Sequence, residues 1–286
     1  MKFNKPLVFA LLLGFCTPEL IAAKMMNPSK RHEQKIASGP KIRVLLEKET
    51  SSALLEVKGE YKVISGETHS LLSSGFTGKR FVIHGMKEGL RWGEEYPDIF
   101  QIVLLPQSEN TTFFVDGIQY RGAMIVTQGP NYKISIVNEV PIEEFIKSTL
   151  SIAVNAHLSL EAMAALVITA RTEAYYLATK GDPLSRLWDV DAKGCDYFGH
   201  AITFSKSLDE AISSTRFMVM KKSGSSSEQE IPFAARWSAN KSQSELSLTG
   251  AEELALKGYD AKKILKTYFP QAKIVTTLQP SPTFLR

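Results

Sequence analysis

Carboxylic acids stand at both ends of a long acid-free stretch in the middle of the chain. Glu143 and Glu144 come first, residues 145–160 hold no acid, and Glu161 follows. A carboxyl group kept protonated in a dry site can donate a proton to a leaving group and then act as a base. The three glutamates are therefore candidates for acid–base chemistry, although acids at the start of a helix also stabilise that helix.

A second set of candidates could bind a ligand or a metal. Arg171 lies with Glu161 in a mostly apolar segment, where a charged residue usually has a pairing or a binding role. Cys195 and His200 lie five residues apart and could both face a zinc ion. Two ligands do not complete a closed zinc site, so no cofactor is expected. The sequence contains no G-x-G-x-x-G, Walker, H-E-x-x-H or G-x-S-x-G motif.

Two kinds of segment must position these residues. From residue 41 to 136, short apolar runs rich in Val, Ile, Phe and Thr are separated by Gly, Pro or Ser, which is typical of β-strands. From Pro141 onward the apolar residues recur at helical spacing, most clearly over about 160–180. Ser207 and Glu210 predict a capping box for a later helix. This segregation indicates an α+β fold, with short strands in the N-terminal half and helices clustered after residue 140.

The N-terminus has the layout of a secretory signal. Two lysines precede a short apolar run, and the small residues Ala22 and Ala23 follow it. We therefore predict a signal peptide over residues 1–23, a flexible polar tether over 24–40 and one domain over 41–286. The protein would then be exported to the periplasm or cell envelope. An uncleaved signal would instead keep the protein at the membrane.

The charge and cysteine content narrow the class of partner. The formal net charge is +4, and no dense basic patch is interleaved with aromatic residues. Nucleic-acid binding is therefore not expected, whereas a mild positive excess suits an anionic polymer such as a cell wall. Cys16 lies in the predicted signal, which leaves Cys195 alone in the mature chain without an internal disulfide. Export without disulfides is compatible with a bacterial envelope.

Short motifs follow one another in order after residue 119. They read YRG, VPIEEFI, LEAM, ARTEAYY, WDV, AISST and GAEELALKGYDAKKILKTYFP. In this order they resemble the motifs of the stage II sporulation protein D (SpoIID/LytB) family, in which VPIEEFI corresponds to V-P-L-E-D-Y-L. The resemblance covers roughly residues 41–274, and it implies peptidoglycan as the substrate class.

The family resemblance also implies a place for a catalytic acid. The best-described family activity is lytic transglycosylase action, in which one carboxyl group acts first as acid and then as base. The family places this acid ten residues after the first Glu of V-P-L-E-D-Y-L and eight before the Glu of L-E-A-L. Counting from Glu143 and back from Glu161 both gives Ala153. The resemblance therefore implies a site that has lost its acid, unless Glu144 or Glu161 supplies one from another direction.

Other positions that the family places near its pocket also differ in this chain. The family's Gln falls on Leu166, its S-G-G-x-T loop reads SANKS at 238–242, and its S-Q pair reads Ser247–Leu248. The residues that the resemblance implies for a glycan-binding groove are Glu161, Arg171, Ser238, Asn240 and Ser247.

The resulting expectation is an exported cell-envelope protein that binds peptidoglycan glycan strands, or assists an amidase, during wall remodelling or division. Its transglycosylase site would be degenerate. Two alternatives stay open: an active lytic transglycosylase with a relocated acid, and an exported structural protein without a role at the wall.

Overall fold

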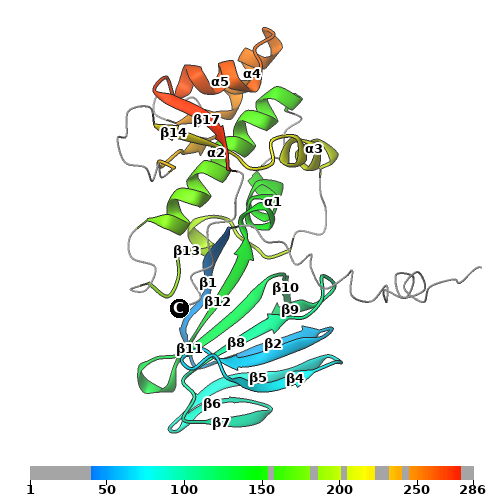
Figure 1. Cartoon of the computed structure of the whole chain (residues 1–286), viewed down its shortest axis with the longest axis vertical. Helices are drawn as coiled ribbons and strands as arrows, with labels where there is room; N and C mark the ends of the chain where they lie inside the picture. Colours follow the sequence, from blue (N-terminus) through cyan, green and yellow to red (C-terminus); the bar gives the residue numbers. More distant parts are fainter. Residues whose placement is uncertain are drawn as a thin grey trace, which may run out of the picture. The chain divides into compact units, whose positions relative to one another are not determined.

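The computed structural model describes residues 40–153, 158–180, 186–200, 205–222, 232–239 and 245–277, with the backbone alone at 152 and 153. The described residues belong to one compact unit that begins at Ala37. Strands follow one another up to Pro141 and the α-helices come after it, which confirms the predicted α+β fold (Figure 1). Residues 1–39 lie outside the described residues, so the signal peptide and the tether stay predictions.

The larger sheet has seven strands. One of its antiparallel pairs joins the first strand of the domain to the strand that leads into the first helix. Ile42 and Val44 alternate along that first strand with more exposed residues and are fully buried, and both Leu45 and Leu46 follow them into the core. In sheet order the strands are β13 (Val190–Asp191), β1 (Lys41–Thr50), β12 (Ile134–Pro141), β11 (Ala123–Gln128), β8 (Gln101–Pro106), β3 (Tyr61–Ser65) and β4 (Leu71–Gly75).

The second sheet has six antiparallel strands and shares its core with the first. Leu55 and Trp92 from this sheet belong to the same buried cluster as Ile102 from the other. The buried indole of Trp92 donates to the Leu55 carbonyl at 3.0 Å, which satisfies its polar atom inside the core. In sheet order the strands are β10 (Ile118–Tyr120), β9 (Thr112–Val115), β2 (Ser52–Lys58), β5 (Lys79–Met86), β6 (Gly89–Trp92) and β7 (Glu94–Pro97).

The helices gather beside one end of the sheets, and α2 runs between them (Figure 1). This helix contacts the other four as well as β1, and twelve of its residues are buried. Such a helix, apolar on all sides, belongs inside a protein. None of the helices within the described ranges is long and apolar enough to span a membrane. The α-helices of the described segments are α1 (Ile142–Ala153), α2 (Leu160–Thr179), α3 (Lys206–Ser214), α4 (Leu248–Leu256) and α5 (Ala261–Tyr268).

Two short strand pairs lie among the helices. β14 (Met218–Lys222) pairs antiparallel with β17 (Ala272–Thr276), and β15 (Trp237–Ser238) pairs parallel with β16 (Leu246–Ser247). The β14–β17 pair joins segments that are far apart in the sequence, and β14 and β15 both contact α2.

The predicted capping box of α3 is wrong. The helix begins at Lys206, so its N-cap is Ser205, whose side chain makes no capping hydrogen bond. The hydroxyl groups of Ser205 and Ser207 lie 2.6 Å apart and hydrogen-bond to each other instead. The N-cap is therefore Ser205 rather than the predicted Ser207, so the helix starts two residues earlier than the serine–glutamate spacing indicates.

Candidate functional site

Helices α1 and α2 form the frame that the sequence predicts around the acid-free stretch. Glu143 and Glu144 lie in the first turn of α1, as expected for acids next to the positive end of a helix. The apolar face of α1, with Ile146 and Leu150, is buried against the core. Ala153, to which the resemblance assigns the catalytic acid, is the last residue of α1.

Arg171 lies inside this frame and has no exposed side-chain surface. Its Nε and Nη2 donate to the two carboxylate oxygens of Glu143 at 2.8 and 2.9 Å. Its Nη1 donates to the carbonyl oxygens of Thr215 at 2.8 Å and Met218 at 3.2 Å. Arg171 therefore joins α1, α2 and the segment between α3 and β14, and its position differs from the groove surface that was expected for a glycan contact.

Glu144 lies on the more open side of the same first turn. Its Oε2 is 3.8 Å from Nδ1 of His200, and 35% of its side chain is exposed. Burial lowers the pKa of His200, the positive charges of Arg121 and Lys147 lower it further, and Glu144 opposes the shift. The structure thus brings the candidate acid Glu144 together with His200, which the sequence had associated with Cys195.

Two other glutamates bind the backbone at helix starts. Glu161, in the first turn of α2, accepts from the amide of Ala261 at 2.7 Å. Glu252 of α4 accepts from both the amide and the hydroxyl of Ser159 at 2.8 Å. Each carboxylate satisfies a donor that a helix N-terminus leaves without an intrahelical partner. Glu252 was not predicted from the sequence, because its partner is 93 residues away.

The two serines of the predicted groove do come together. Ser238 and Ser247 are register partners in the parallel pair β15–β16. Ser247 is fully buried, and its hydroxyl caps α4 by accepting from the Gly250 amide at 3.1 Å. Ser247 therefore positions a helix, while Ser238 is the more exposed member of the pair. Asn240, the remaining residue predicted for this groove, lies outside the described residues.

Cys195 and His200 lie on one loop that packs against the sheets. The Cys195 thiol donates to the Asp191 carbonyl at 3.2 Å, and burial raises its pKa to about 12. Zinc binds the thiolate, so a thiol held in its neutral form is a poor ligand. Across the described part of the chain, no group of three or more His, Cys, Asp or Glu residues could hold a metal ion.

Glu173 is a further acid that the sequence analysis did not select. It projects from α2 toward Ala235 and Arg236, and burial raises its pKa. Its Oε2 is shielded from solvent and has no hydrogen-bond partner. A lone acid in an apolar helix was the sequence feature that could have identified it, but with one oxygen shielded Glu173 is a partly buried acid rather than an accessible one.

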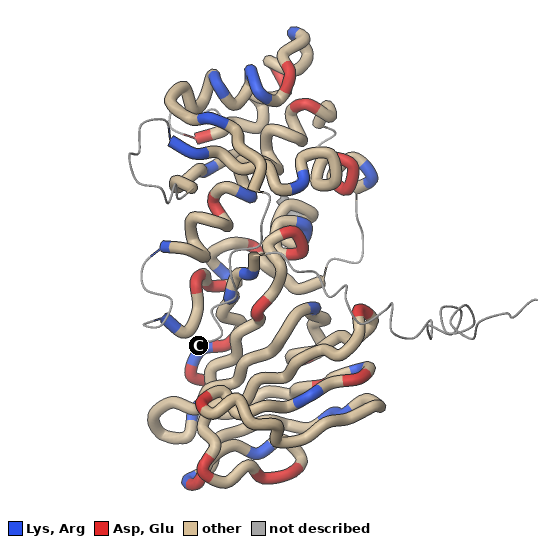
Figure 2. The backbone as a smooth tube through the Cα atoms, in the orientation of Figure 1, with Lys and Arg blue, Asp and Glu red and all other residues tan. Residues whose placement is uncertain are grey.

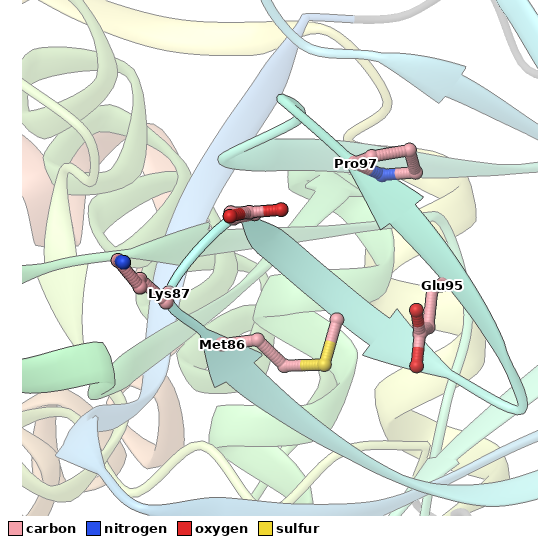
Figure 3. Close-up of a pocket in the computed structure, with 5 residues that line it drawn as sticks. Met86, Lys87, Glu95 and Pro97 are labelled. Carbon is pink, nitrogen blue, oxygen red and sulfur yellow. The ribbon is translucent and has the colours of Figure 1, made fainter.

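A small hollow lies elsewhere, on the second sheet. Met86, Lys87, Glu95 and Pro97 line it together with Glu88, around the β5–β6 turn and β7 (Figure 3). Its volume of about 220 Å³ is below the roughly 300–1,000 Å³ of most ligand pockets. In Figure 1 these strands lie at the end of the sheets away from the helices, so the hollow is separate from the α1–α2 frame.

Comparison with known proteins places this frame in a family. Residues 131–221, which run from just before β12 to β14, match the family model of SpoIID, stage II sporulation protein. An uncharacterized protein of Chlamydia muridarum is 32% identical over 277 residues, which cover 96% of this chain and 91% of that protein. An uncharacterized protein of Chlamydia pneumoniae is 33% identical over 276 residues, with 96% and 95% coverage. The resemblance read from the motifs is thereby confirmed.

Proposed function

Because the chain belongs to the SpoIID family, we propose that it is an exported cell-envelope protein that binds the glycan strands of peptidoglycan. It would support wall remodelling or division, alone or by assisting an amidase, without cleaving glycan itself. Membership of the family supports a cell-wall-related role. We infer the binding of glycan and the absence of cleavage from the residues of this chain.

One observation carries this proposal. The matched segment contains both helices of the frame, yet the residue at the position of the family's acid is Ala153, the last residue of α1. A methyl group cannot transfer a proton. General acid–base catalysis contributes ~10²–10⁴-fold, so a site without its acid would lose most of its activity.

The bonds of the neighbouring acids support the same conclusion. The carboxylate of Glu143 is bound by Arg171, that of Glu161 by the Ala261 amide, and that of Glu252 by Ser159. A general acid must be able to reach the substrate oxygen and to change its protonation state during the reaction. These three carboxylates stabilise the helices and would have to give up those bonds to act.

The test uses the protein without its first 23 residues, incubated with stripped glycan strands and with whole sacculi. We expect retention on sacculi and no anhydro-terminated products by mass spectrometry. The matched variant is Ala153→Glu, which restores a carboxyl group at the counted position and is expected to release such products. Failure of the wild-type chain to sediment with sacculi would remove the glycan-binding proposal.

The alternative is a lytic transglycosylase with Glu144 as its relocated acid. The partly exposed side chain of Glu144 and its position beside His200 favour it over Glu161, whose Oε2 already binds a helix start. Under this alternative the wild-type chain would produce anhydro-terminated products. Glu144→Gln would abolish them, whereas Glu161→Gln would leave them.

A further inference from the structure

Arg121 lies in the YRG motif, at the turn between β10 and β11, and its backbone is held firmly. The Asn138 side-chain amide donates to the Arg121 carbonyl at 2.8 Å. The next residue, Gly122, has a φ of +83°, and a Cβ there would lie 2.2 Å from the Glu139 carbonyl oxygen. Only glycine fits this turn without displacing β12. The turn therefore sets the direction in which the Arg121 side chain leaves the sheet.

The Arg121 guanidinium lacks a carboxylate partner of the kind that Arg43 and Arg171 have. Arg43 and Arg171 each bind a carboxylate through two nitrogens, on Asp189 and Glu143. The Nε of Arg121 is shielded from solvent and has no hydrogen-bond partner, and no described acid forms an ion pair with this side chain. A shielded donor without an acceptor costs stability, and a guanidinium fork matches the two oxygens of a carboxylate.

Two further basic groups lie beside Arg121. The amide of His200 donates to the Gln119 carbonyl at 2.7 Å, which attaches its loop to the strand that leads to Arg121. Arg121 and Lys147 both act electrostatically on the His200 imidazole. Lys147 also binds Asp209 at 2.7 Å, and Glu144 lies 3.8 Å from His200. Asp209 therefore neutralises Lys147, and the lowered pKa favours neutral His200, so Arg121 supplies the positive charge that a ligand would meet here. Glu144 limits how much negative charge that ligand can bring.

We propose that Arg121, with His200 and Lys147 beside it, binds a carboxylate group of the ligand. A planar, singly charged carboxylate fits one guanidinium fork, whereas a dianionic phosphate would be repelled more strongly by Glu144. If the ligand is peptidoglycan, which rests on the proposed function, two carboxylates are available. One is the lactyl carboxylate of muramic acid, which is free once the stem peptide is removed, and the other is the terminal carboxylate of a stem peptide.

The experiment compares soluble ligands by calorimetric titration of the wild-type chain. A stripped peptidoglycan tetrasaccharide carries lactyl carboxylates, while chitotetraose has a comparable sugar chain without them. A free stem peptide supplies the other carboxylate, and inorganic phosphate is the competitor. We expect the stripped tetrasaccharide to bind more tightly than chitotetraose, and phosphate not to displace it at equal concentration. Equal binding of the two sugars, or displacement by phosphate, would overturn the proposal, and tighter binding of the stem peptide would move the site to that carboxylate.

Variants assign the site to its residues. Arg121→Gln should weaken binding of the stripped tetrasaccharide roughly 10- to 100-fold, because it removes a charge-assisted hydrogen-bond pair. It should not lower the melting temperature, since the shielded Nε that it removes has no hydrogen-bond partner. Glu144→Gln should tighten binding, and Arg91→Gln, on the second sheet, is the matched control without effect.

The results separate this site from the proposed function. Sacculi that retain wild-type and Arg121→Gln chains equally would refute the carboxylate site while the glycan-binding role stands. Arg121-dependent binding of the soluble tetrasaccharide by a chain that fails to sediment with sacculi would support the site and refute the wall-binding role.

Discussion

Replacing Arg171 with methionine tests whether this residue stabilises the fold or binds glycan. The substitution keeps the apolar length of the side chain and removes all of its donors. Glu143 loses both of its hydrogen bonds, and the carbonyl groups of Thr215 and Met218 lose theirs. Removing one partner of a buried ion pair costs ~3–5 kcal/mol. Because 27% of the Glu143 side chain is exposed, water can solvate the carboxylate that loses its partner. We therefore expect a loss of stability at the lower end of that range.

In a domain of this size, 1 kcal/mol corresponds to roughly 2–4 °C, so ~3 kcal/mol should lower the melting temperature by roughly 6–12 °C. Urea unfolding followed by tryptophan fluorescence measures the same loss. Arg91→Met is the control, because an exposed pair contributes only ~0–1 kcal/mol. Arg171→Lys should also destabilise, since an ammonium cannot replace the fork. A loss below ~1 kcal/mol for Arg171→Met, together with loss of retention on sacculi, would refute this structural role and place Arg171 in the groove.

Three further outcomes follow from single residues. Burial raises the folded-state pKa of Glu173 above its ordinary 4.5, so the ionised carboxylate lowers the stability of the fold at neutral pH. Glu173→Gln should therefore raise the melting temperature at pH 7.5. The gain should vanish at pH 4, where the wild-type carboxyl group is protonated. Ser247→Ala removes the cap of α4 and should cost about 1 kcal/mol by urea unfolding, whereas Thr267→Ala on exposed α5 surface should cost less. In a Cys16→Ser chain, a pKa raised from 9.0 to about 12 should slow alkylation of Cys195 by about a thousandfold, and denaturant should restore the rate.

The fold was predictable where the periodicity of the sequence is long. The apolar spacing over 160–180 predicts α2 at Leu160–Thr179 because one helix must bury its residues on several sides. The strands β6 and β7 have only four residues each and were not predicted. Such strands are defined by the register of their neighbours rather than by their own alternation. The start of α3 was missed for a related reason, since several serines compete for the cap position.

The candidate site was predictable in its frame but not in its side-chain contacts. Glu143 pairs with Arg171, 28 residues away, and Glu161 binds the Ala261 amide, 100 residues away. Spacing along a helix indicates which residues share a face, but it carries no information about partners on other elements. The motif order located the helices correctly, whereas the roles of Arg171 and Ser247 depended on burial that only the tertiary structure defines.

The distribution of charge in the frame decides which chemistry this surface can support. Acidic and basic residues are interspersed over both the sheets and the helices, without a single charged stripe (Figure 2). At the frame itself, Arg171 neutralises the charge of Glu143, and Glu161 accepts a hydrogen bond from the Ala261 amide at a helix start. Arg121, in contrast, has a buried donor without an acceptor. Proton transfer requires an acid that is free to move its proton, while recognition of an anion requires a cation that is still unpaired. Under the proposed function, a frame in which Glu143 and Glu161 are bound and Arg121 lacks an acceptor would bind a carboxylate-bearing polymer without cleaving it, and Glu144 is the acid on which the alternative depends.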